Sequence, residues 1–295
     1  MASSCLRSWW LFERVGIPQT NTIHFRYGTA YHAVVERHLK GEPKFPKGWY
    51  EQKDGKISRK HADEIKELFI HALDGKLIPA AGYPADHPHK IEWDVGPFEW
   101  SDPSLKHMVG QVDLAHFEPI NGWRWPSVED HKTTGSWDWA KTPTELAADL
   151  QGIPYARALW LELGAKHEYI GMRHNTVLKK TQYNGAQQRL GRAKIINVPQ
   201  PGLHITDIEK GWSKMEETVV LMQRYESETN VAKVPGTYSS CDKFGGCQHK
   251  AVCKLKTTLG QYYDGSKKEA AQEGIEGRKR DFGAKKGKHA KLFGG

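Results

Sequence analysis

The sequence predicts an α/β (α+β) fold: a mixed central β-sheet that contains an antiparallel meander and is flanked by helices. The strand signal is strongest in residues 108–134, where Asn121-Gly122 stands between flanks rich in Val, Phe, Trp and Thr. Asn-Gly favours the two-residue turn of a β-hairpin, and such flanks favour paired strands. The helix signal comes from residues 58–75 and 206–228, whose apolar side chains recur at helical spacing.

Length and composition predict a sizeable core and a polyanionic partner. The chain has 295 residues, 26% of them charged, and its formal net charge is +8. A basic balance favours nucleic acid as the partner. No apolar run approaches the roughly 18 residues of a membrane span, and the N-terminus lacks the hydrophobic region of a signal peptide. We therefore expect a soluble, cytoplasmic protein with no membrane partner.

The first part of the chain is expected to supply three helices and one strand. A helix at 3–14 carries a cluster of aromatic residues, and a second helix covers 28–39. The helix at 58–75 has a clear apolar stripe and ends at Gly75, a residue that favours helix termination. Residues 90–100 predict a strand that precedes the hairpin and completes the meander.

The later part of the chain predicts one more strand and a long helix. Residues 168–180 alternate as a strand does. Residues 181–203 are rich in Gly, Gln and basic side chains, and predict either a DNA-facing segment or a solvated loop. The apolar stripe of 206–228 predicts a core helix. Residues 260–295 lack apolar periodicity and predict a basic, disordered tail.

The hairpin places two aspartates side by side. With the Asn-Gly pair as a two-residue loop, paired residue numbers add to 243, so Asp113 lies directly opposite Asp130. Two like charges in this position destabilise a sheet unless a cation lies between them. Lys132 shares the sheet face of Asp130, and Glu129 and His131 point to the opposite face. Two carboxylates and one amine on a single face predict a metal-dependent hydrolytic site.

Four motifs in this order resemble the RecB-like branch of the PD-(D/E)XK nuclease superfamily. They are Gly28-x-x-x-His32, G-Q-V-D at 110–113, E-D-H-K-T-T at 129–134, and Gln151-x-x-x-Tyr155. The resemblance implies a PD-(D/E)XK nuclease core and phosphodiester hydrolysis as the reaction.

The resemblance also implies a ligand set for one cation. Asp113 and Asp130 would bind Mg²⁺ or Mn²⁺, which prefer oxygen ligands. The ring of His32 and the main-chain carbonyl of His131 would complete the protein ligands. Lys132 should be protonated beside the two carboxylates of the empty site. Once a cation cancels the charge of these carboxylates, Lys132 could orient or deprotonate the attacking water.

A further helix is expected to bring two residues to the DNA. Thr142-Pro-Thr-Glu is a capping box with Pro at the first helical position, and the helix it opens should carry both Gln151 and Tyr155. Pro154 should kink this helix. The resemblance implies that Gln151 and Tyr155 contact the DNA backbone; a Tyr155 that merely packs is the alternative.

The four cysteines predict a second inorganic site. Cys5 stands alone, while Cys241, Cys247 and Cys253 form C-x5-C-x5-C. Structural zinc usually takes cysteines two to four residues apart, whereas a cluster tolerates wider spacing. The pattern resembles the RecB-like nucleases that carry an iron–sulfur cluster, including CRISPR-adaptation exonucleases and the AddB type. This implies a structural [4Fe–4S] cluster; zinc, with His249 as a substitute ligand, and unligated thiols are the alternatives.

The expected protein is an iron–sulfur exonuclease that acts on DNA ends, with a single-strand preference implied by the resemblance. A structure-specific or restriction-type endonuclease is one alternative, and a non-catalytic DNA-binding subunit of a repair or CRISPR complex is another. Protein partners would then come from repair, recombination or CRISPR adaptation. Four segments are expected: a cluster-ligand segment (1–27), the nuclease core (28–205), a helix with the cysteine segment (206–259), and the tail (260–295).

Overall fold

The computed structural model describes residues 5–15, 23–51, 57–83, 88–105, 108–119, 124–179, 192–237, 249 and 253. By packing, the chain forms two compact units. Residues 21–215 form one, here called the central unit. Residues 1–20 and 216–295 form the other, the terminal unit. The Asn121-Gly122 turn, Cys241, Cys247 and the tail from 260 onward lie outside the described residues.

Within the described residues, the central unit is built on a six-stranded mixed sheet. The strands are β1 (His89–Val95), β2 (Gly110–His116), β3 (Ser127–Thr134), β4 (Tyr169–Leu178), β5 (Ala193–Asn197) and β6 (Leu203–His204). β1, β2 and β3 form an antiparallel meander, and β3 and β4 run parallel. β5 and β6 each pair antiparallel with β4. The α+β class, with a mixed sheet and a meander, is confirmed.

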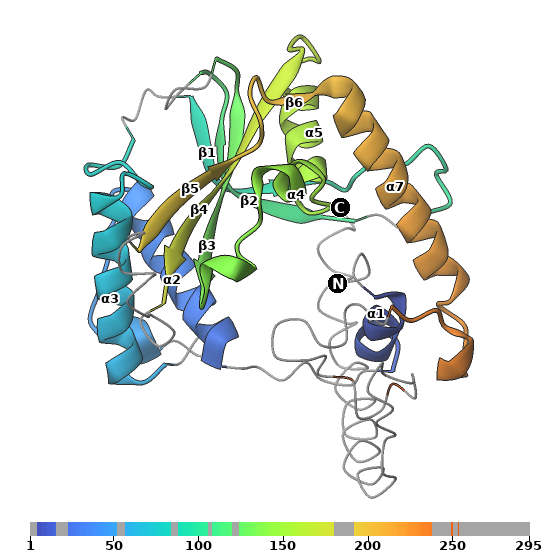
Figure 1. Cartoon of the computed structure of the whole chain (residues 1–295), viewed down its shortest axis with the longest axis horizontal. Coiled ribbons are helices and arrows are strands. Elements are labelled where there is room, and N and C mark those ends of the chain that lie inside the picture. The colour runs from blue at the N-terminus through green and yellow to red at the C-terminus, as the bar shows by residue number, and fades with distance from the viewer. Residues whose placement is uncertain are drawn as a thin grey trace, which may run out of the picture. The chain divides into compact units, whose positions relative to one another are not determined.

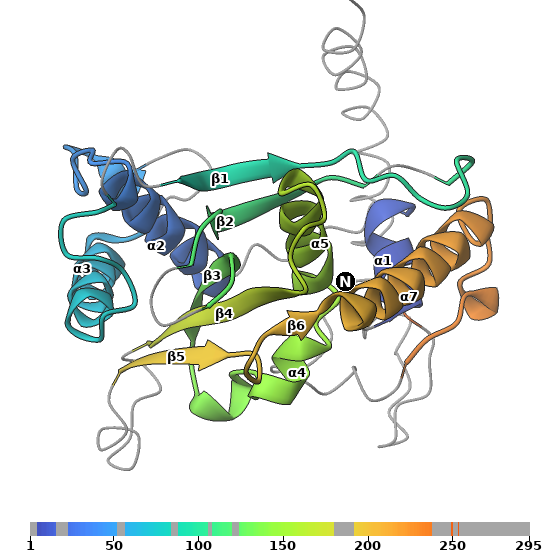
Figure 2. The same ribbon diagram turned by 90° about the horizontal axis from the view of Figure 1, so that it is seen from above.

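Helices flank the sheet on both sides (Figures 1 and 2). α2 (Ile23–Leu39) and α3 (Arg59–Asp74) pack on one face, where their buried side chains meet Leu114 and Val177. α4 (Pro143–Ala147) and α5 (Gly152–Glu162) lie on the other side. The remaining helices are α1 (Leu6–Glu13), α7 (Ile205–Arg224) and short 3₁₀ helices at Trp49–Glu51, Trp137–Trp139 and Val231–Lys233.

Capping residues determine where several of these helices begin and end. The hydroxyl of Ser58 accepts a hydrogen bond from the His61 N–H at the start of α3, and Gly75 forms its C-cap. At α4, Thr142 and Glu145 form the predicted capping box, in which each side chain accepts from the other residue's backbone N–H. These caps satisfy backbone groups that a helix end leaves without partners.

The predicted register of the hairpin is confirmed where the two strands pair. Leu114 faces Glu129, and His116 faces Ser127, so paired numbers add to 243. The ladder stops one pair short of Asp113 and Asp130. The connection is longer than a two-residue turn would leave, because the described residues between His116 and Ser127 are not in strands.

The helix expected from Thr142 to Tyr155 is instead two helices. α4 ends at Ala147, and Gln151 is the N-cap residue of α5. Pro154 therefore lies in the first turn of α5, not in a helix interior. The first backbone N–H groups of a helix have no intrahelical partner, so proline costs nothing there and produces no kink.

Two other boundaries differ from the prediction. β1 ends at Val95 rather than at Trp100, because Gly96 turns the chain with φ +102°. A Cβ at Gly96 would lie 2.8 Å from the carbonyl oxygen of Met108, so the turn requires glycine. The segment 181–203 is not a loop throughout, since its described part contributes β5 and β6.

In the terminal unit, α1 packs against residues that lie more than 200 positions later in the chain. Its apolar side chains form a small buried cluster with Val234 and Cys253; the α1 members are Leu6, Trp10 and Leu11. The expected first helix is confirmed, and its aromatic residues supply part of this core. The N- and C-terminal parts of the chain therefore share one core within this unit.

Arg7 ties the same two segments together through hydrogen bonds. Its buried guanidinium donates to the carbonyl oxygens of Val234 at 2.7 Å, Cys253 at 3.0 Å and Ala232 at 3.3 Å. A guanidinium holds several acceptors in a fixed planar geometry, so a single side chain fixes three points of the later segment.

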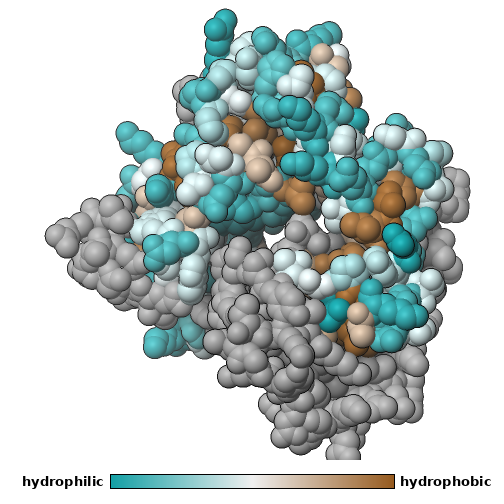
Figure 3. Space-filling view, turned by 45° about the vertical axis from the view of Figure 1, so that its right-hand side comes forward, coloured by the Kyte–Doolittle hydropathy of each residue, from teal (hydrophilic) through white to brown (hydrophobic). Residues whose placement is uncertain are grey.

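Among the described residues, no helix combines the length and apolar character needed to cross a bilayer. On the face seen in Figure 3, the described surface is mainly hydrophilic, and hydrophobic residues form small areas between polar ones.

Candidate metal centre

Asp113 on β2 and Asp130 on β3 come together as the register predicts. Burial raises the pKa of Asp130, Lys132 opposes this increase, and the charge of Asp113 adds to it. Burial opposes ionisation of Asp113 too, but the nearby His32 outweighs it and lowers the pKa of Asp113. A cation between the two groups would compensate for their charge.

Lys132 contacts the same carboxyl pair. Its Nζ lies 2.6 Å from Oδ2 of Asp130. Burial disfavours the charged amine, but the Asp130 carboxylate outweighs burial and raises the pKa of Lys132. The lysine is therefore protonated in the metal-free site, in agreement with the prediction.

His32 reaches the pair from α2, across a helix–sheet contact. Its Nδ1 lies 3.3 Å from Oδ2 of Asp113. The same Asp113 oxygen accepts the main-chain N–H of His131 at 2.7 Å. The structure therefore brings the predicted residues of β2, β3 and α2 together. The main-chain carbonyl of His131 as a metal ligand stays a prediction.

Glu92 on β1 is a residue that the sequence analysis missed. Among the described residues, His32, Glu92 and Asp113 form a group whose ligand atoms all lie within 4.8 Å of one another. Burial, together with the charges of Asp113 and Glu36, raises the pKa of Glu92 to about 7. The missed signal is the register of the meander, because Trp93 pairs with Val112 and the next position along places Glu92 beside Asp113.

These residues fit a hard divalent cation. The centre offers carboxylate oxygens from Glu92, Asp113 and Asp130 and one imidazole nitrogen from His32. Mg²⁺ and Mn²⁺ take oxygen ligands, and Mn²⁺ also accepts imidazole. The buried carboxylates exceed the positive charge that Lys132 supplies, so a cation would relieve repulsion that the metal-free protein carries.

The opposite face of β3 carries a buried polar network that does not reach the centre. Glu129 is fully buried and lies 2.6 Å from Arg173 and 2.9 Å from His116. Asn175 donates a third bond to it at 2.8 Å. Burial opposes ionisation of Glu129, but Arg173 and His116 lower its pKa to about 2. The predicted exclusion of the Glu129 side chain from the centre is therefore confirmed.

Gln151 and Tyr155 lie at the start of α5, close to the centre. Burial raises the pKa of the Tyr155 hydroxyl, the neighbouring Gln151 side chain lowers it, and the charges of Asp130 and Lys132 act on it as well. A Cβ on Gly110 would lie 2.7 Å from the Tyr155 ring, so glycine at the start of β2 permits this packing. The motif glycine and the motif tyrosine therefore contact each other.

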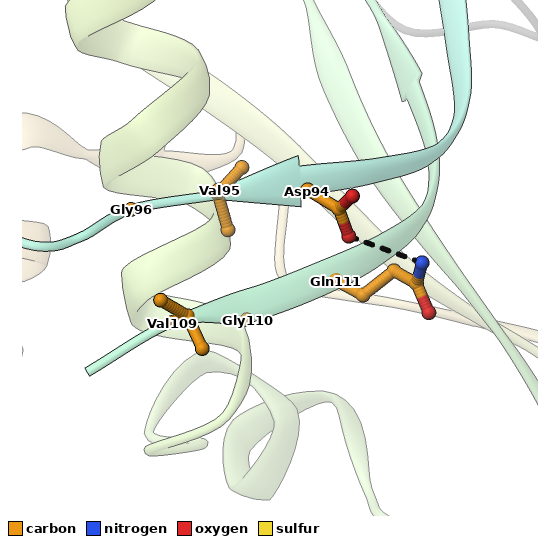
Figure 4. Close-up of a pocket in the computed structure, with 6 residues that line it drawn as sticks. All are labelled: Asp94, Val95, Gly96, Val109, Gly110 and Gln111. Carbon is orange, nitrogen blue, oxygen red and sulfur yellow. Dashed lines mark hydrogen bonds between the residues drawn. The ribbon is translucent and has the colours of Figure 1, made fainter. Parts of the chain in front are cut away.

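A pocket of about 490 Å³ lies beside the start of β2 (Figure 4). It is lined by Asp94, Val95, Gly96, Val109, Gly110 and Gln111. Its one carboxylate, Asp94, accepts a hydrogen bond from Gln111 at 3.1 Å.

The cysteine site is described only in part. Cys5 and Cys253 are buried in the terminal unit, and among the described residues the cysteines form no compact group of metal-binding size. His249 is fully buried, and its ring nitrogens have no hydrogen-bond partner among the described residues. The Cys253 N–H donates to the His249 carbonyl, so the two residues are one helical turn apart.

Comparison with known proteins gives little. No protein-family model matches the chain, and no curated protein matches it either. A crystal structure described as SSO0001 is similar with a TM-score of 0.31 and 13% sequence identity. The similarity covers 87% of this chain and 98% of that one. A TM-score this low supports no conclusion about fold or function, so the proposed function rests on the metal centre alone.

Proposed function

We propose that this protein is a Mg²⁺- or Mn²⁺-dependent deoxyribonuclease of the PD-(D/E)XK type, an exonuclease that acts on DNA ends and prefers single strands. One observation supports it most: His32 lies 3.3 Å from Asp113, Lys132 lies 2.6 Å from Asp130, and the charge of Asp113 acts on Asp130. Two carboxyl groups on neighbouring strands, with a lysine and a histidine beside them, match the donors of a hydrolytic metal site.

Asp113, Asp130 and His32 would hold the cation, with Glu92 as an added carboxylate and the His131 carbonyl as a further ligand. When bound, Mg²⁺ or Mn²⁺ supplies Lewis acidity toward a phosphate oxygen and toward the attacking water. The protein's own part is to hold these ligands in a largely buried position, where few water molecules compete for the cation.

Lys132 is the group that would take up the proton of the attacking water. With its Nζ 2.6 Å from Asp130, the ammonium is placed to donate a hydrogen bond to a phosphate oxygen or to the water. When the carboxylate charge is neutralised, the pKa of Lys132 falls, because the field that raised it is gone. The amine can then accept the proton of the attacking water. Phosphodiester hydrolysis forms the new P–O bond from this water and breaks the bond to the leaving oxygen.

Gln151 and Tyr155 would position the DNA backbone. Amide and phenol groups donate hydrogen bonds to phosphate oxygens, and their place at the start of α5 keeps them beside the carboxyl pair. The net charge of +8 favours binding of the polyanion at low ionic strength. DNA ends, single strands and partners in repair, recombination or CRISPR adaptation follow from the family resemblance alone.

A structural [4Fe–4S] cluster on Cys5, Cys241, Cys247 and Cys253 is part of the same proposal. The burial of Cys5 and Cys253 in one unit supports it. The ring of His249 is fully buried and has no hydrogen-bond partner within the part of the chain that the structure describes, which supports the alternative, a zinc ion bound by His249 and cysteines.

The test is cleavage of end-labelled single- and double-stranded DNA with Mg²⁺, Mn²⁺ or EDTA. We expect cation-dependent release of short products from single-stranded ends. Asp113→Asn and Asp130→Asn should each abolish it while the fold and DNA binding persist, because each removes a metal ligand. Lys132→Ala should lower turnover more than metal affinity.

Asp94→Asn is the matched control, since Asp94 lies on the neighbouring strand but bonds to Gln111. It should retain activity. Near-wild-type cleavage by either metal-site variant would refute the assignment. Cleavage of circular DNA would favour the endonuclease alternative, and cation-independent DNA binding without cleavage would favour the non-catalytic one.

A further inference from the structure

Two further polar side chains lie next to Asp130 in the fold, His174 on β4 and Asp149 between α4 and α5. His174 on β4 lies opposite Asp130 in the parallel register and is 4% exposed. Its Nε2 is 3.3 Å from Oδ2 of Asp130 and 4.0 Å from Oδ2 of Asp149, and it has no hydrogen-bond partner among the described residues. The imidazole therefore lies between a predicted metal ligand and a carboxylate that is not part of the metal centre.

Asp149 connects His174 with α5. Its Oδ2 pairs with the Lys141 amine, while its Oδ1 accepts the main-chain N–H of Gln151 at 3.3 Å. Its own carbonyl accepts the N–H of Ile153 at 2.9 Å. One residue thus fixes the first turn of α5, from which Gln151 and Tyr155 project, and faces His174 at the same time.

The carboxylates of Asp130 and Asp149 both face Nε2 of His174, so we assign a ring hydrogen to that nitrogen. Lys132 and His174 then both lie beside Oδ2 of Asp130, so the other oxygen, Oδ1, can turn toward a cation.

We propose that His174 and Asp149 are a positioning pair, which holds the Asp130 carboxylate for metal binding and fixes the start of α5 relative to it. The pair would hold Gln151 and Tyr155, the residues proposed to contact DNA, at a fixed position relative to the cation. This role rests on the proposed function for the tasks of Asp130, Gln151 and Tyr155. Neither His174 nor Asp149 need touch the substrate. Removal of such supporting partners typically costs about 10- to 100-fold in metal affinity.

The substitutions separate this role from simple helix capping. Asp149→Asn keeps an oxygen for the Gln151 N–H but loses the charge that faces His174 and Lys141. His174→Phe removes the donor, whereas His174→Gln places an amide N–H near the position of Nε2. Asp102→Asn is the matched control. Asp102 is an exposed aspartate that accepts the Ser104 N–H at 2.8 Å, in the same local pattern as Asp149 and Gln151.

The measurements are the Mn²⁺ dissociation constant by calorimetry and the melting temperature in EDTA, on the full chain. We expect Asp149→Asn and His174→Phe to weaken Mn²⁺ binding about tenfold or more. His174→Gln should restore most of the affinity, and Asp102→Asn should change nothing. Asp149→Asn should melt within a few degrees of wild type, because the cap is retained. If His174→Phe does not fold, the other two variants decide.

The outcomes distinguish two failures. If wild type binds Mn²⁺ in an Asp113-dependent manner and Asp149→Asn binds it as tightly as wild type does, as a folded His174→Phe then also would, the positioning role is refuted and the metal centre stands. If wild type shows no Asp113-dependent Mn²⁺ binding, the proposed function fails, and the positioning role fails with it.

Discussion

Glu92 adopts a backbone conformation that few glutamates adopt. Its φ is +48°, in the left-handed region that favours glycine, and its side chain approaches Asp113 and His32. Such a conformation costs on the order of 1–3 kcal/mol and tends to occur where function requires it. The buried carboxylate adds repulsion from Asp113 and Glu36. In the metal-free protein, Glu92 is therefore a source of instability that a cation would offset.

Replacing this side chain should separate stability from metal binding. Glu92→Gln should weaken Mn²⁺ binding about tenfold and raise the melting temperature of the metal-free protein. Because the folded state raises the pKa of Glu92 to about 7, its destabilising effect begins above the ordinary pKa and is complete above about pH 7. The gain from Glu92→Gln should therefore be larger at pH 8 than at pH 5, as thermal melts in EDTA would measure.

Asp94→Asn provides the control for Glu92→Gln, because it lies two residues along the same strand and its carboxylate bonds to Gln111. It should leave Mn²⁺ affinity and its pH dependence unchanged. An unaltered Mn²⁺ affinity in Glu92→Gln would remove this residue from the ligand set.

At the residue scale, the sequence predicts side chains that follow a period and misses those that depend on irregular backbone. Asp113, Asp130 and Lys132 follow from strand alternation and one register, and His32 follows from a motif. Strand alternation alone would not place Glu92, because its positive φ interrupts the alternation of β1; only the pairing of β1 with β2 puts it beside Asp113. His174 and Asp149 depend on the parallel pairing of β3 and β4, which is a long-range contact and leaves no local pattern.

At the element scale, β3 and β4 bury two histidines that should control acid stability. Burial lowers the pKa of His131 to about 4, and burial with two nearby lysines does the same for His174. The folded state thus binds protons less readily than the unfolded chain. The stability that depends on these two histidines remaining neutral is fully present above about pH 6.5. It is lost as the pH falls toward 4, by up to about 1.4 kcal/mol per pH unit for each histidine.

His131→Leu should reduce this dependence by one histidine's share, because the replacement cannot bind a proton. Urea unfolding in EDTA at pH 7, 6, 5 and 4 measures the slope. Val177→Ala, a buried change on β4, should lower stability by a similar amount at every pH. An equal slope in wild type and His131→Leu would contradict the assignment.

The elements themselves were predictable where local signals are strong. α3 has a cap at each end and an apolar stripe, and the capping box places the start of α4. The break between α4 and α5 was not predictable from the same signals. Asp149 and Gln151 provide local turn contacts there, and Gly152 leaves room for the Met172 side chain, which would have to move for a Cβ at that position. That requirement is tertiary, so a helical reading of 142–155 missed it.

At the scale of the whole chain, the terminal unit joins segments that are distant in sequence. Arg7 is buried and binds three carbonyl oxygens of residues 232–253, while Leu6, Trp10 and Leu11 share a core with Cys253. Cys5 directly precedes α1, and its Sγ accepts the Thr237 N–H at 3.5 Å. The composition of this unit from both ends of the chain is not visible in sequence periodicity. The cysteine spacing and its family resemblance were the only signals for it.

A shared cofactor would make Cys5 behave like a member of the distant cysteine triplet. Linking segments more than 200 residues apart restricts the unfolded chain, by about 5 kcal/mol on the loop-entropy scale of disulfides, which serves as an analogy. Cys5→Ala should therefore bleach the visible absorption of anaerobically purified protein, lower its iron content and melting temperature, and expose both terminal segments to protease.

Leu11→Ala is the matched control, since it removes a buried side chain of α1 but no ligand. It should cost about 2–5 kcal/mol of stability and leave the metal content per folded chain unchanged. Stoichiometric zinc without iron, lost on His249→Ala, would replace the cluster by a zinc site. Metal content that stays at the wild-type level in Cys5→Ala would show that the two segments are held by packing and by Arg7, without a common cofactor.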